Sequence, residues 1–555
     1  MSDQTIDMSD QTIDQTPQAA AWASADSQRR VRRRYAADRR LQAYGIIAIA
    51  LAVGLLAILV SSLVITGFPA FVQTKVDLTV FIDPAKVDAS KPTDGNYRAV
   101  VRDALAGFLP ADATDKQKTD VAKILSADAP YIVRDYVVKH PDTIGKTITL
   151  PIAVSDPFDQ LHKGVIPKEV DALSWSQLLY FERLQNRGVV VEEGGRTSLK
   201  LDVYVDPAKI EAGPPPTGDF AALARDSLQA YLPDVHDTAL FGMLADDAPE
   251  AIAKLVTADP NLIGKTAQVV FPVSPPFAAL ATGETPKVLN PRFNPTQIEA
   301  YDAMLAKGVV HTPFNWELFF NADSRFPERA GLAGAITGSF YALLVCLLLS
   351  FPIGIAAAVY LEEFAPKNRL TDLIEVNINN LAAVPSVVFG LLGLAVFLGY
   401  FGLPRSAPLV GGMVLSLMTL PTIIIATRAA LKAVPPSIRE AALGVGASKH
   451  QVMMHHVLPL AMPGILTGTI IGMAQALGET APLLLIGMNA FIPSIENMGI
   501  LEPATSLPTQ IYSWADSPER GFVSRTSAAI LVLLGFLVVM NIVAIALRQM
   551  FERKW

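Results

Sequence analysis

The sequence predicts a polytopic α-helical membrane protein with six transmembrane helices, into which a duplicated α/β module is inserted. Three observations predict this class: a high apolar content, six long apolar runs, and a long polar region that contains an internal repeat. Of the 555 residues, 51% are hydrophobic and only 17% are charged, unlike an average soluble enzyme, a disordered chain or a coiled coil. The formal charge of −7 argues against nucleic-acid binding.

The chain lacks the sequence signatures of catalysis and of metal binding. Its one cysteine, Cys346, excludes an internal disulfide and a cysteine-based zinc or iron–sulfur site, and its apolar surroundings predict a buried thiol. The seven histidines form no HExxH pattern, and no GxxxxGK[ST] phosphate loop occurs, so this chain is not expected to hydrolyse ATP. We therefore expect no catalytic residue and no metal ligand.

Residues 1–44 form a polar, basic tail that opens with two copies of MSDQTID, for which a frayed tail or a duplicated start at Met8 is the expectation. The apolar run 45–67 follows, long enough to cross about 30 Å of hydrocarbon. This run is too long for a signal-peptide core and no clear cleavage site follows it. We therefore expect an uncleaved first transmembrane helix whose amino end lies in the cytoplasm.

Residues 75–329 read as a soluble module with an internal duplication. The segment LTVFIDPAKVD (78–88) recurs as LDVYVDPAKIE (201–211), and further matching segments follow at an offset of about 120 residues. Each copy, about 78–193 and 201–313, predicts strand, helix, helix, strand, helix. Two copies are fewer than a solenoid needs, so either two small domains or one pseudo-symmetric domain is expected.

Beyond the module, residues 332–547 form a membrane domain, and residues 548–555 form a short tail. Few soluble helices stay apolar on all faces over such lengths, so each long run predicts a membrane span. With the first helix the total is six, the other five being Leu332–Leu361, Leu381–Phe401, Leu409–Ala426, Leu460–Met488 and Ser527–Leu547.

Basic residues in the short loops predict the orientation of these helices. With the amino end inside, the cytoplasmic segments hold sixteen lysines and arginines, whereas the two short external loops hold three. Basic residues concentrate on the cytoplasmic side of membrane proteins. Both termini are therefore expected in the cytoplasm, and residues 75–329 on the opposite, extracytoplasmic side.

The predicted cytoplasmic loop between the third and fourth of these later-domain spans contains a spaced motif. Its members are Glu440, Ala441, Ala442, Gly446, Leu458 and Pro459. The residues predict a short helix over Ser437–Gly444, capped by Ser437, then a sharp turn at Gly446 and a second short helix over Ala447–Val457. Pro459 suits the first turn of the next membrane helix, where its missing N–H costs no hydrogen bond. This pattern resembles the EAA loop of ABC-importer permeases, where it implies a contact with an ATPase subunit.

Further segments, at 327–366, 379–397 and 476–487, resemble PstA, a permease family of the bacterial phosphate ABC importer. The resemblance covers residues 327–547 and the first helix, a little under half of the chain, and residues 75–325 resemble the extracytoplasmic insert of a long-form subgroup. It implies an inner-membrane heterodimer with a PstC-like permease, a pair of PstB-like ATPases that bind ATP, and a PstS-like phosphate-binding protein. It also implies no cofactor and no catalytic chemistry in this chain.

One departure from the family pattern bears on the substrate. Many PstA sequences carry an arginine four residues before the glutamate of the GET motif, and this chain has Gln475 there. An arginine fork pairs well with phosphate oxygens, so its absence leaves open another oxyanion or small solute. A membrane sensor with tandem extracytoplasmic domains is a rival from another class, which the short cytoplasmic segments disfavour.

Glu479 is the only ionisable residue in the run 460–488, and ionisable residues inside membrane segments mark functional sites. The apolar runs hold no lysine or arginine to pair with an anion, so the counter-charge is expected from helix ends or from the partner permease. The alternative is that Glu479 only locks helices together. The candidate residues for the translocation path are Gln475, Glu479, Thr480, Pro385 and Ser386.

Overall fold

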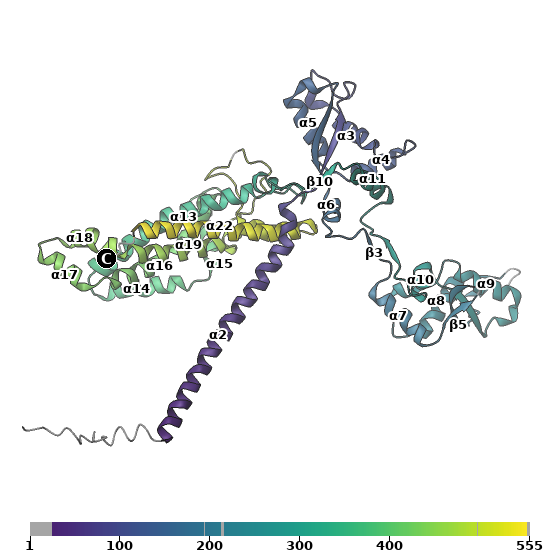
Figure 1. The fold of residues 1–555 in the computed structure, drawn as a ribbon, viewed down its shortest axis with the longest axis horizontal. Helices are drawn as coiled ribbons and strands as arrows, with labels where there is room; N and C mark the ends of the chain where they lie inside the picture. The colour runs from purple at the N-terminus through teal and green to yellow at the C-terminus, as the bar shows by residue number, and fades with distance from the viewer. Residues whose placement is uncertain (1–24, 194, 212–215, 497, 552–555) are drawn as a thin grey trace, which may run out of the picture. The chain divides into compact units, whose positions relative to one another are not determined.

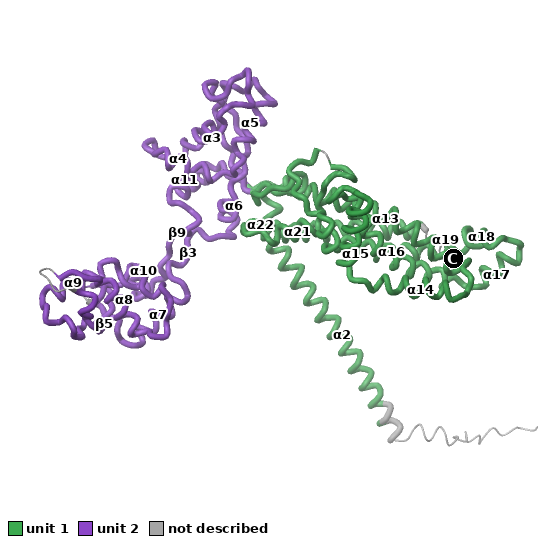
Figure 2. Tube along the Cα trace, turned by 180° about the vertical axis from the view of Figure 1, so that it is seen from behind, with its two compact units in different colours: residues 1–73, 312–555 green, residues 74–311 purple. Residues whose placement is uncertain are grey.

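The computed structural model describes residues 25–193, 195–211, 216–496 and 498–551. The chain divides into two compact units, a membrane unit of residues 1–73 with 312–555 and an inserted module of residues 74–311 (Figure 2). The expectations for the repeated heptapeptide and for the last four residues of the tail lie outside the described residues.

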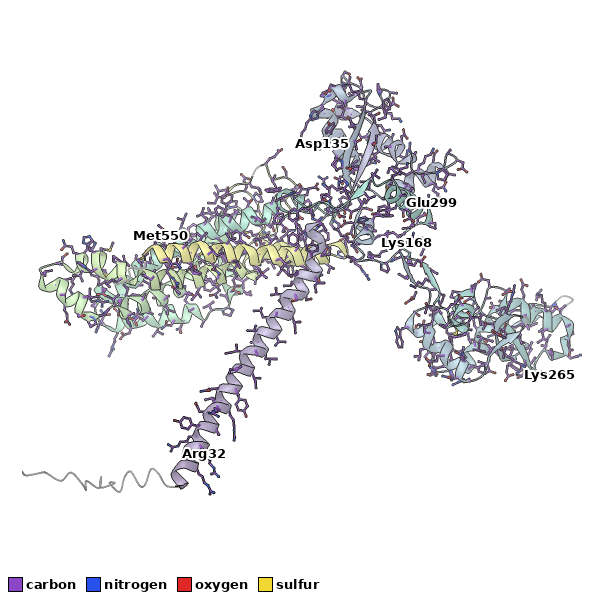
Figure 3. The ribbon with its side chains drawn as sticks, in the orientation of Figure 1. Arg32, Asp135, Lys168, Lys265, Glu299 and Met550 are labelled. Carbon is purple, nitrogen blue, oxygen red and sulfur yellow. The ribbon has the colours of Figure 1, made fainter. Side chains whose placement is uncertain are left out.

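Within the described residues of the membrane unit, five helices are long and apolar enough to span a membrane, and a bent pair raises the number to six. The five are α2 (Ala25–Gly67), α13 (Ala333–Val359), α16 (Pro408–Ala433), α19 (Leu458–Gly478) and α22 (Gly521–Phe551) (Figure 1). The apolar window of α2 is unburied and its side chains project into open space (Figure 3). Its last residue packs on α22, because a Cβ on Gly67 would lie 2.9 Å from the backbone nitrogen of Ala528.

The run 381–401 is not the single straight helix that its composition predicts. It is divided between α14 (Arg369–Ala382) and α15 (Ser386–Leu392), which continues as the π-helix η7 (Gly393–Tyr400), with a bend of 104° between the two parts. Pro385 explains the break, since proline lacks an N–H and keeps the preceding residue out of helical geometry. The expectation of one continuous span is therefore corrected to a bent pair.

Close packing of the membrane helices depends on small residues. A Cβ on Gly412 of α16 would lie 2.4 Å from Val345 of α13, and one on Gly468 of α19 would lie 2.1 Å from Ala426 of α16. Glycine at such points lets helix backbones approach closely in a bilayer. Cys346 is fully buried in this core, as its apolar run predicts, and its sulfur lies 3.4 Å from the Thr419 hydroxyl.

The run 460–488 also divides. Helix α19 ends at Gly478, Glu479 has extended backbone angles (φ −80°, ψ 114°), and a short helix α20 (Ala481–Leu485) follows. The expected helix is thus ten residues too long at its carboxyl end. The apolar composition continues through the break, so hydrophobicity alone does not reveal it, whereas Pro482 and the polar pair Glu479–Thr480 do mark it.

A second apolar cluster joins the segments on either side of the inserted module to the rest of the membrane unit. It brings together η1 (Phe68–Phe71), α12 (Glu317–Phe320), α21 (Leu507–Ala515) and the first turns of α22. The two segments pair with each other, since Gln73 donates its N–H to the Pro313 carbonyl at 3.0 Å. Arg525, one of the three basic residues counted in the predicted external loops, is instead buried in α22 and donates to the Ala330 carbonyl at 2.6 Å.

The inserted module contains two three-stranded antiparallel sheets, each with its own hydrophobic core. We call residues 74–168 with 290–311 lobe A, and residues 172–286 lobe B. Lobe A contains β1 (Lys75–Phe81), α3 (Tyr97–Ala106), α4 (Asp115–Ala122), α5 (Ala129–Lys139), β2 (Thr147–Ala153), α6 (Asp156–His162), α11 (Pro295–Ala306) and β10 (Val310–His311). Lobe B contains α7 (Trp175–Asn186), β4 (Val190–Glu193), β5 (Arg196–Tyr204), α8 (Phe220–Tyr231), α9 (Ala248–Ala258), β8 (Thr266–Pro272) and α10 (Pro275–Ala281).

The two sheets have equivalent strand orders, β10–β1–β2 in lobe A and β4–β5–β8 in lobe B. The register pairs Lys75 with Ala153 in the first and Ser198 with Pro272 in the second. Alternating burial along β1 and β5 places their apolar residues on one face, against the helices, as strand periodicity requires. A separate pair of short strands, β3 (Glu169–Asp171) and β9 (Lys287–Leu289), joins the chain segments that enter and leave lobe B.

The lobes do not coincide with the two sequence copies. Helix α7 is the last helix of the first copy, yet Phe181 and Leu184 are buried in the core of lobe B. Helix α11 ends the second copy, yet Tyr301 and Met304 are buried in the core of lobe A. Lobe B is therefore inserted into lobe A. Lobe B contains the last helix and strand of the first copy, α7 and β4, and lobe A contains those of the second copy, α11 and β10.

Candidate functional site

The motif loop begins with α17 (Pro436–Gly444), which carries Glu440, Ala441 and Ala442. The expected Ser437 cap is wrong: the helix already begins at Pro436, and the described side chains supply no capping hydrogen bond at this end. Pro435 occupies the capping position, and Pro436 fits the first turn because its missing N–H would have no partner within the helix. Ser437 instead lies inside the first turn.

Gly446 forms the sharp turn that the motif predicts. Its φ of +91° lies in the left-handed region. The N–H of Gly446 donates to Leu443 at 2.9 Å and that of Ala447 to Ala442 at 3.1 Å, the hydrogen-bond pattern of a Schellman motif at a helix end. No described atom lies within 4 Å of where a Cβ would stand, so the backbone conformation, not crowding, requires glycine here.

The second part of the loop is an extension of the membrane helix. Ser448 caps α18 (Lys449–Val452) through a capping box with Gln451, in which the Gln451 N–H donates to the serine hydroxyl at 3.3 Å. The π-helical turn η8 (Met453–Val457) follows and leads into α19, so that residues 449–478 form one helical rod. The expected separate helix over 447–457 is thus corrected to the first turns of this rod, with Pro459 inside it.

The loop has one buried face and one exposed face. Ala442 is buried with Val452 and Val457 in a cluster that also includes the end of α16. On the outer side Glu440 and Ala441 are exposed, and so are Leu443 at 46% and Val445 at 87%. His455 and His456 are also exposed, and no group of three metal-binding side chains occurs within the described residues. The exposed apolar tip is therefore available to a protein partner.

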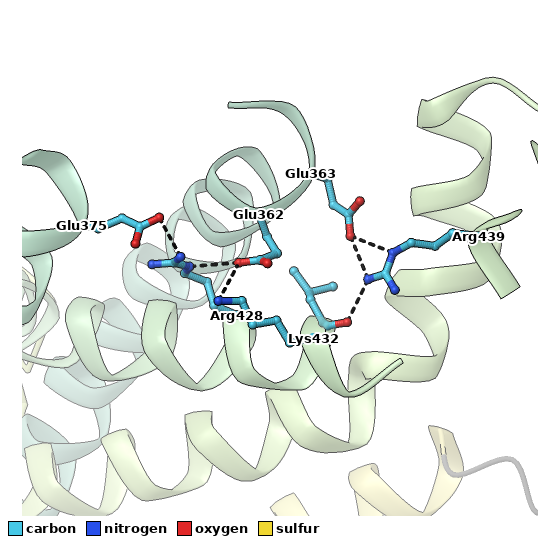
Figure 4. Close-up of polar contacts among 7 residues, drawn as sticks. Glu362, Glu363, Glu375, Arg428, Lys432 and Arg439 are labelled. Atoms are coloured by element: carbon cyan, nitrogen blue, oxygen red, sulfur yellow. Dashed lines mark hydrogen bonds and ion pairs between the residues drawn. The ribbon is translucent and has the colours of Figure 1, made fainter. Parts of the chain in front are cut away.

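A cluster of three glutamates and three basic residues joins this loop to the membrane helices (Figure 4). Its members are Glu362 and Glu363 in the π-helix η6 (Tyr360–Phe364), Glu375 in α14, Arg428 and Lys432 in α16, and Arg439 in α17. Sequence reasoning used the basic residues only as signs of orientation and missed the cluster. The partners are 53 to 76 residues apart along the chain for the two arginines, so no local pattern reveals them.

The candidate path residues lie around the break after α19. Helix α15 packs directly on α20, since a Cβ on Gly390 would lie 2.7 Å from the Cα of Pro482. Ser386, Glu479 and Thr480 are partly buried, whereas Gln475 and Pro385 are exposed. The structure thus brings the two groups of candidates, around 385 and around 480, onto neighbouring elements. The motif residues lie at the other end of the α19 rod.

A polytopic membrane unit with an exposed EAA-type loop defines a class, the permease subunits of ABC importers. A family model described as "Binding-protein-dependent transport system inner membrane component" matches residues 350–555. A second model, described as a domain of unknown function (DUF3333), matches residues 28–172 and 195–289.

Curated relatives narrow the class. The phosphate transport system permease protein PstA of Pasteurella multocida is 30% identical over 43% of this chain and 84% of its own length. PstA 1 of Mycobacterium tuberculosis is 32% identical over 41% of this chain and 74% of its own length. The probable ABC transporter permease protein YqgI of Bacillus subtilis is 29% identical over 46% of this chain and 89% of its own length. Among solved structures, a chain of the inward-facing MetNI methionine ABC transporter is 16% identical, with a TM-score of 0.33. The match covers 40% of this chain and 98% of that chain.

The chain belongs to the PstA family of ABC-importer permeases. It is a multi-pass inner-membrane subunit and not an enzyme itself. The expectation from the 327–366, 379–397 and 476–487 segments is confirmed by these relatives.

Proposed function

We propose that this chain imports inorganic phosphate across the bacterial inner membrane as one half of a translocation pore. The other half is a PstC-like permease, a pair of PstB-like ATPases binds the ATP, and a PstS-like protein delivers phosphate. The observation that carries the proposal is the continuous α19 rod, which links the exposed motif loop at one end to the break at Glu479 at the other. Two functional ends on one continuous element suit a subunit that couples ATP hydrolysis to transport.

In this proposal both termini and the motif loop face the cytoplasm, and the inserted module faces the outside. The distribution of basic residues supports this orientation. Helix α13 supports it as well, because it starts shortly after the chain returns from the module and ends at the glutamates that contact Arg428 and Arg439. The module and the motif loop therefore attach to opposite ends of one membrane helix.

The motif loop is the proposed ATPase contact. Val445 and Leu443 supply an exposed apolar tip, and the buried Ala442 holds the base of α17 against the membrane helices. An apolar tip on a fixed base suits insertion into a groove on a partner. The residues assigned to coupling are Glu440, Ala441, Ala442, Gly446, Leu458 and Pro459.

Glu479 is the proposed polar centre of the path on this half. A bare carboxylate repels an anion, so we assign it the role of holding an arginine of the partner permease, with Thr480 and Gln475 offering neutral hydrogen bonds. Pro385 and Ser386 begin the helix that packs against α20, which places them on the neighbouring element.

Uptake of radiolabelled phosphate tests this function. A strain that lacks the gene should lose high-affinity uptake, and the wild-type chain should restore it. Unlabelled phosphate should compete with the label, whereas sulfate and molybdate should not. Unchanged phosphate uptake in the deletion strain, or stronger competition by another oxyanion, would assign a different substrate.

A further inference from the structure

Arg439 joins three elements through one guanidinium group. It donates from Nε and Nη2 to Oε1 of Glu363, at 3.1 and 2.8 Å. It also donates from Nη1 to the Val434 carbonyl at 2.8 Å and from Nη2 to the Leu431 carbonyl at 2.9 Å. These carbonyls belong to the end of α16, where a helix leaves its last acceptors without internal partners. The motif helix α17 is thereby bonded to α16 and to the extension of α13.

Arg428 makes a corresponding connection about one turn before the end of α16. Its Nε lies 3.3 Å from Oε2 of Glu362, and its Nη2 lies 2.7 Å from Oε1 of Glu375 in α14. Lys432 adds a looser contact to Glu362 at 3.5 Å. The Arg428, Glu362 and Glu375 side chains are 17% to 34% exposed, so solvent screens these pairs less than ordinary surface pairs.

Two adjacent glutamates of the π-helical turn η6 bond to different partners. Consecutive residues of any helix point in different directions, about 100° apart in an α-helix. Glu362 therefore faces α16 and Glu363 faces α17, as Figure 4 shows. Such π-turns within helices concentrate at functional sites. With three carboxylates and three cations the cluster is balanced in charge, so the array has no net charge of its own to compensate.

The cluster offers a second connection between the loop and the break. From Arg428 it leads through Glu375 to α14, and α14 passes through the bend at Pro385 into α15, which packs on α20. We infer that Glu362, Glu363, Glu375, Arg428 and Arg439 are positioning residues that make α13 and α14 move with the motif loop when the ATPases move it. This inference rests on the proposed function of the loop.

The test uses the whole transporter in proteoliposomes, with phosphate uptake and ATP hydrolysis measured on the same preparation. Glu363→Gln keeps the size of the side chain and removes its charge. We expect phosphate transported per ATP hydrolysed to fall about tenfold, within the usual range of coupling between sites, while the four-component complex still assembles. Glu363→Asp keeps the negative charge and leaves Arg439 on its α16 carbonyls, so this variant should retain most of the ratio.

Asp372→Asn is the matched control, because Asp372 is an exposed carboxylate on α14, three residues before Glu375, and its loss should leave the ratio unchanged. A normal ratio in Glu363→Gln would overturn the inference. Loss of assembly in the single variants would also overturn it, since the cluster would then only brace the fold. An ATPase-contact variant at Gly446, measured in parallel, distinguishes the two proposals: if it uncouples transport while Glu363→Gln does not, the proposed function stands and the inference fails.

Discussion

The motif loop and the inserted module are held to the same membrane helices in different ways. The loop is continuous with α19 through its second half, and Arg439 bonds it to Glu363 at the end of α13 and to two carbonyls at the end of α16. The module is connected by two chain crossings at residues 73–74 and 311–312 and has two cores of its own. A region bonded to several helices can transmit movement to them, whereas a region with its own cores can fold without them. Variants in each region test this contrast.

The largest effect is expected at the loop. Gly446→Val places a β-branched residue at a φ of +91°, a conformation such residues rarely adopt. Phosphate uptake should be nearly abolished while the protein stays in the membrane, measured by radiolabel uptake and by immunoblot of membrane fractions. Gly444→Val is the matched control, since Gly444 is also exposed and lies in α17 with ordinary helical geometry. Equal uptake by the two variants would show that the turn does not matter.

The next effect is expected at the break after α19. Glu479→Gln removes the charge that we propose holds an arginine of the partner permease, so uptake should fall strongly while co-purification with the partner is unchanged. Glu502→Gln, at an exposed glutamate beyond α20, should transport normally. If Glu479→Gln transported normally, or abolished assembly, Glu479 would have no role in the path.

Removal of the module should have a smaller effect than the Gly446 and Glu479 variants, because it should leave assembly of the transporter intact. Gln73 and Pro313 are joined by a backbone hydrogen bond, so a short Gly-Ser linker can replace residues 74–311 without moving the chain ends. The shortened chain should still co-purify with the partner permease and the ATPases. Residues 74–311 expressed alone should be soluble, with the circular dichroism of a mixed α/β protein. Loss of assembly, or an unfolded module, would remove the contrast between the two regions.

The exchange of helices between the lobes can be tested by local stability. Leu184→Ala should destabilise lobe B and Met304→Ala lobe A, each by about 2–5 kcal/mol, because both side chains are fully buried. Hydrogen exchange of the isolated module would locate each loss of protection. If Leu184→Ala exposed the amides of β1 and β2 instead of β5 and β8, the assignment of α7 to lobe B would be wrong.

The smallest effect concerns pH. Burial lowers the pKa of His162 below its usual 6.5, with Asp159 opposing and Lys163 adding to the shift, and the ring lies 3.0 Å from the Tyr301 hydroxyl. The unfolded chain then binds this proton more readily than the folded one, so the stability of lobe A should fall as the pH drops below about 6.5. Urea denaturation of the module at pH 8 and pH 5.5 would measure this difference in the free energy of unfolding. His162→Gln should reduce the difference, and an unchanged difference would show that His162 is not its cause.

Local patterns predicted local structure well. The pattern of the first copy predicted a strand followed by a helix, which are β1 and α3, and the glycine of the motif predicted the turn at 446. Each depends on residues within one or two turns of one another, where propensity and periodicity act directly. The apolar runs likewise predicted membrane helices, because their length exceeds what a soluble helix buries.

Long-range features could not be predicted in this way. A repeat shows that two segments fold alike, but not which core the last helix of each copy joins, and Leu184 suits either lobe by composition. The partners of Arg428 and Arg439 lie on η6, at the end of α13, and on α14. Only the packing of these helices against α16 brings the partners near. The break at Glu479 is instead a local feature: Pro482 and the polar pair mark it, but hydrophobicity alone does not predict it because the apolar composition continues into α20.

The rod that runs from Lys449 to Gly478 has a mechanical consequence. Its 30 residues, at about 1.5 Å of rise each, span about 45 Å. If a rod of that length tilts as one body by about 5° at the loop, its far end moves by about 4 Å. Under the proposed function, a small tilt at the motif loop would therefore displace the segment around Glu479 by several ångströms.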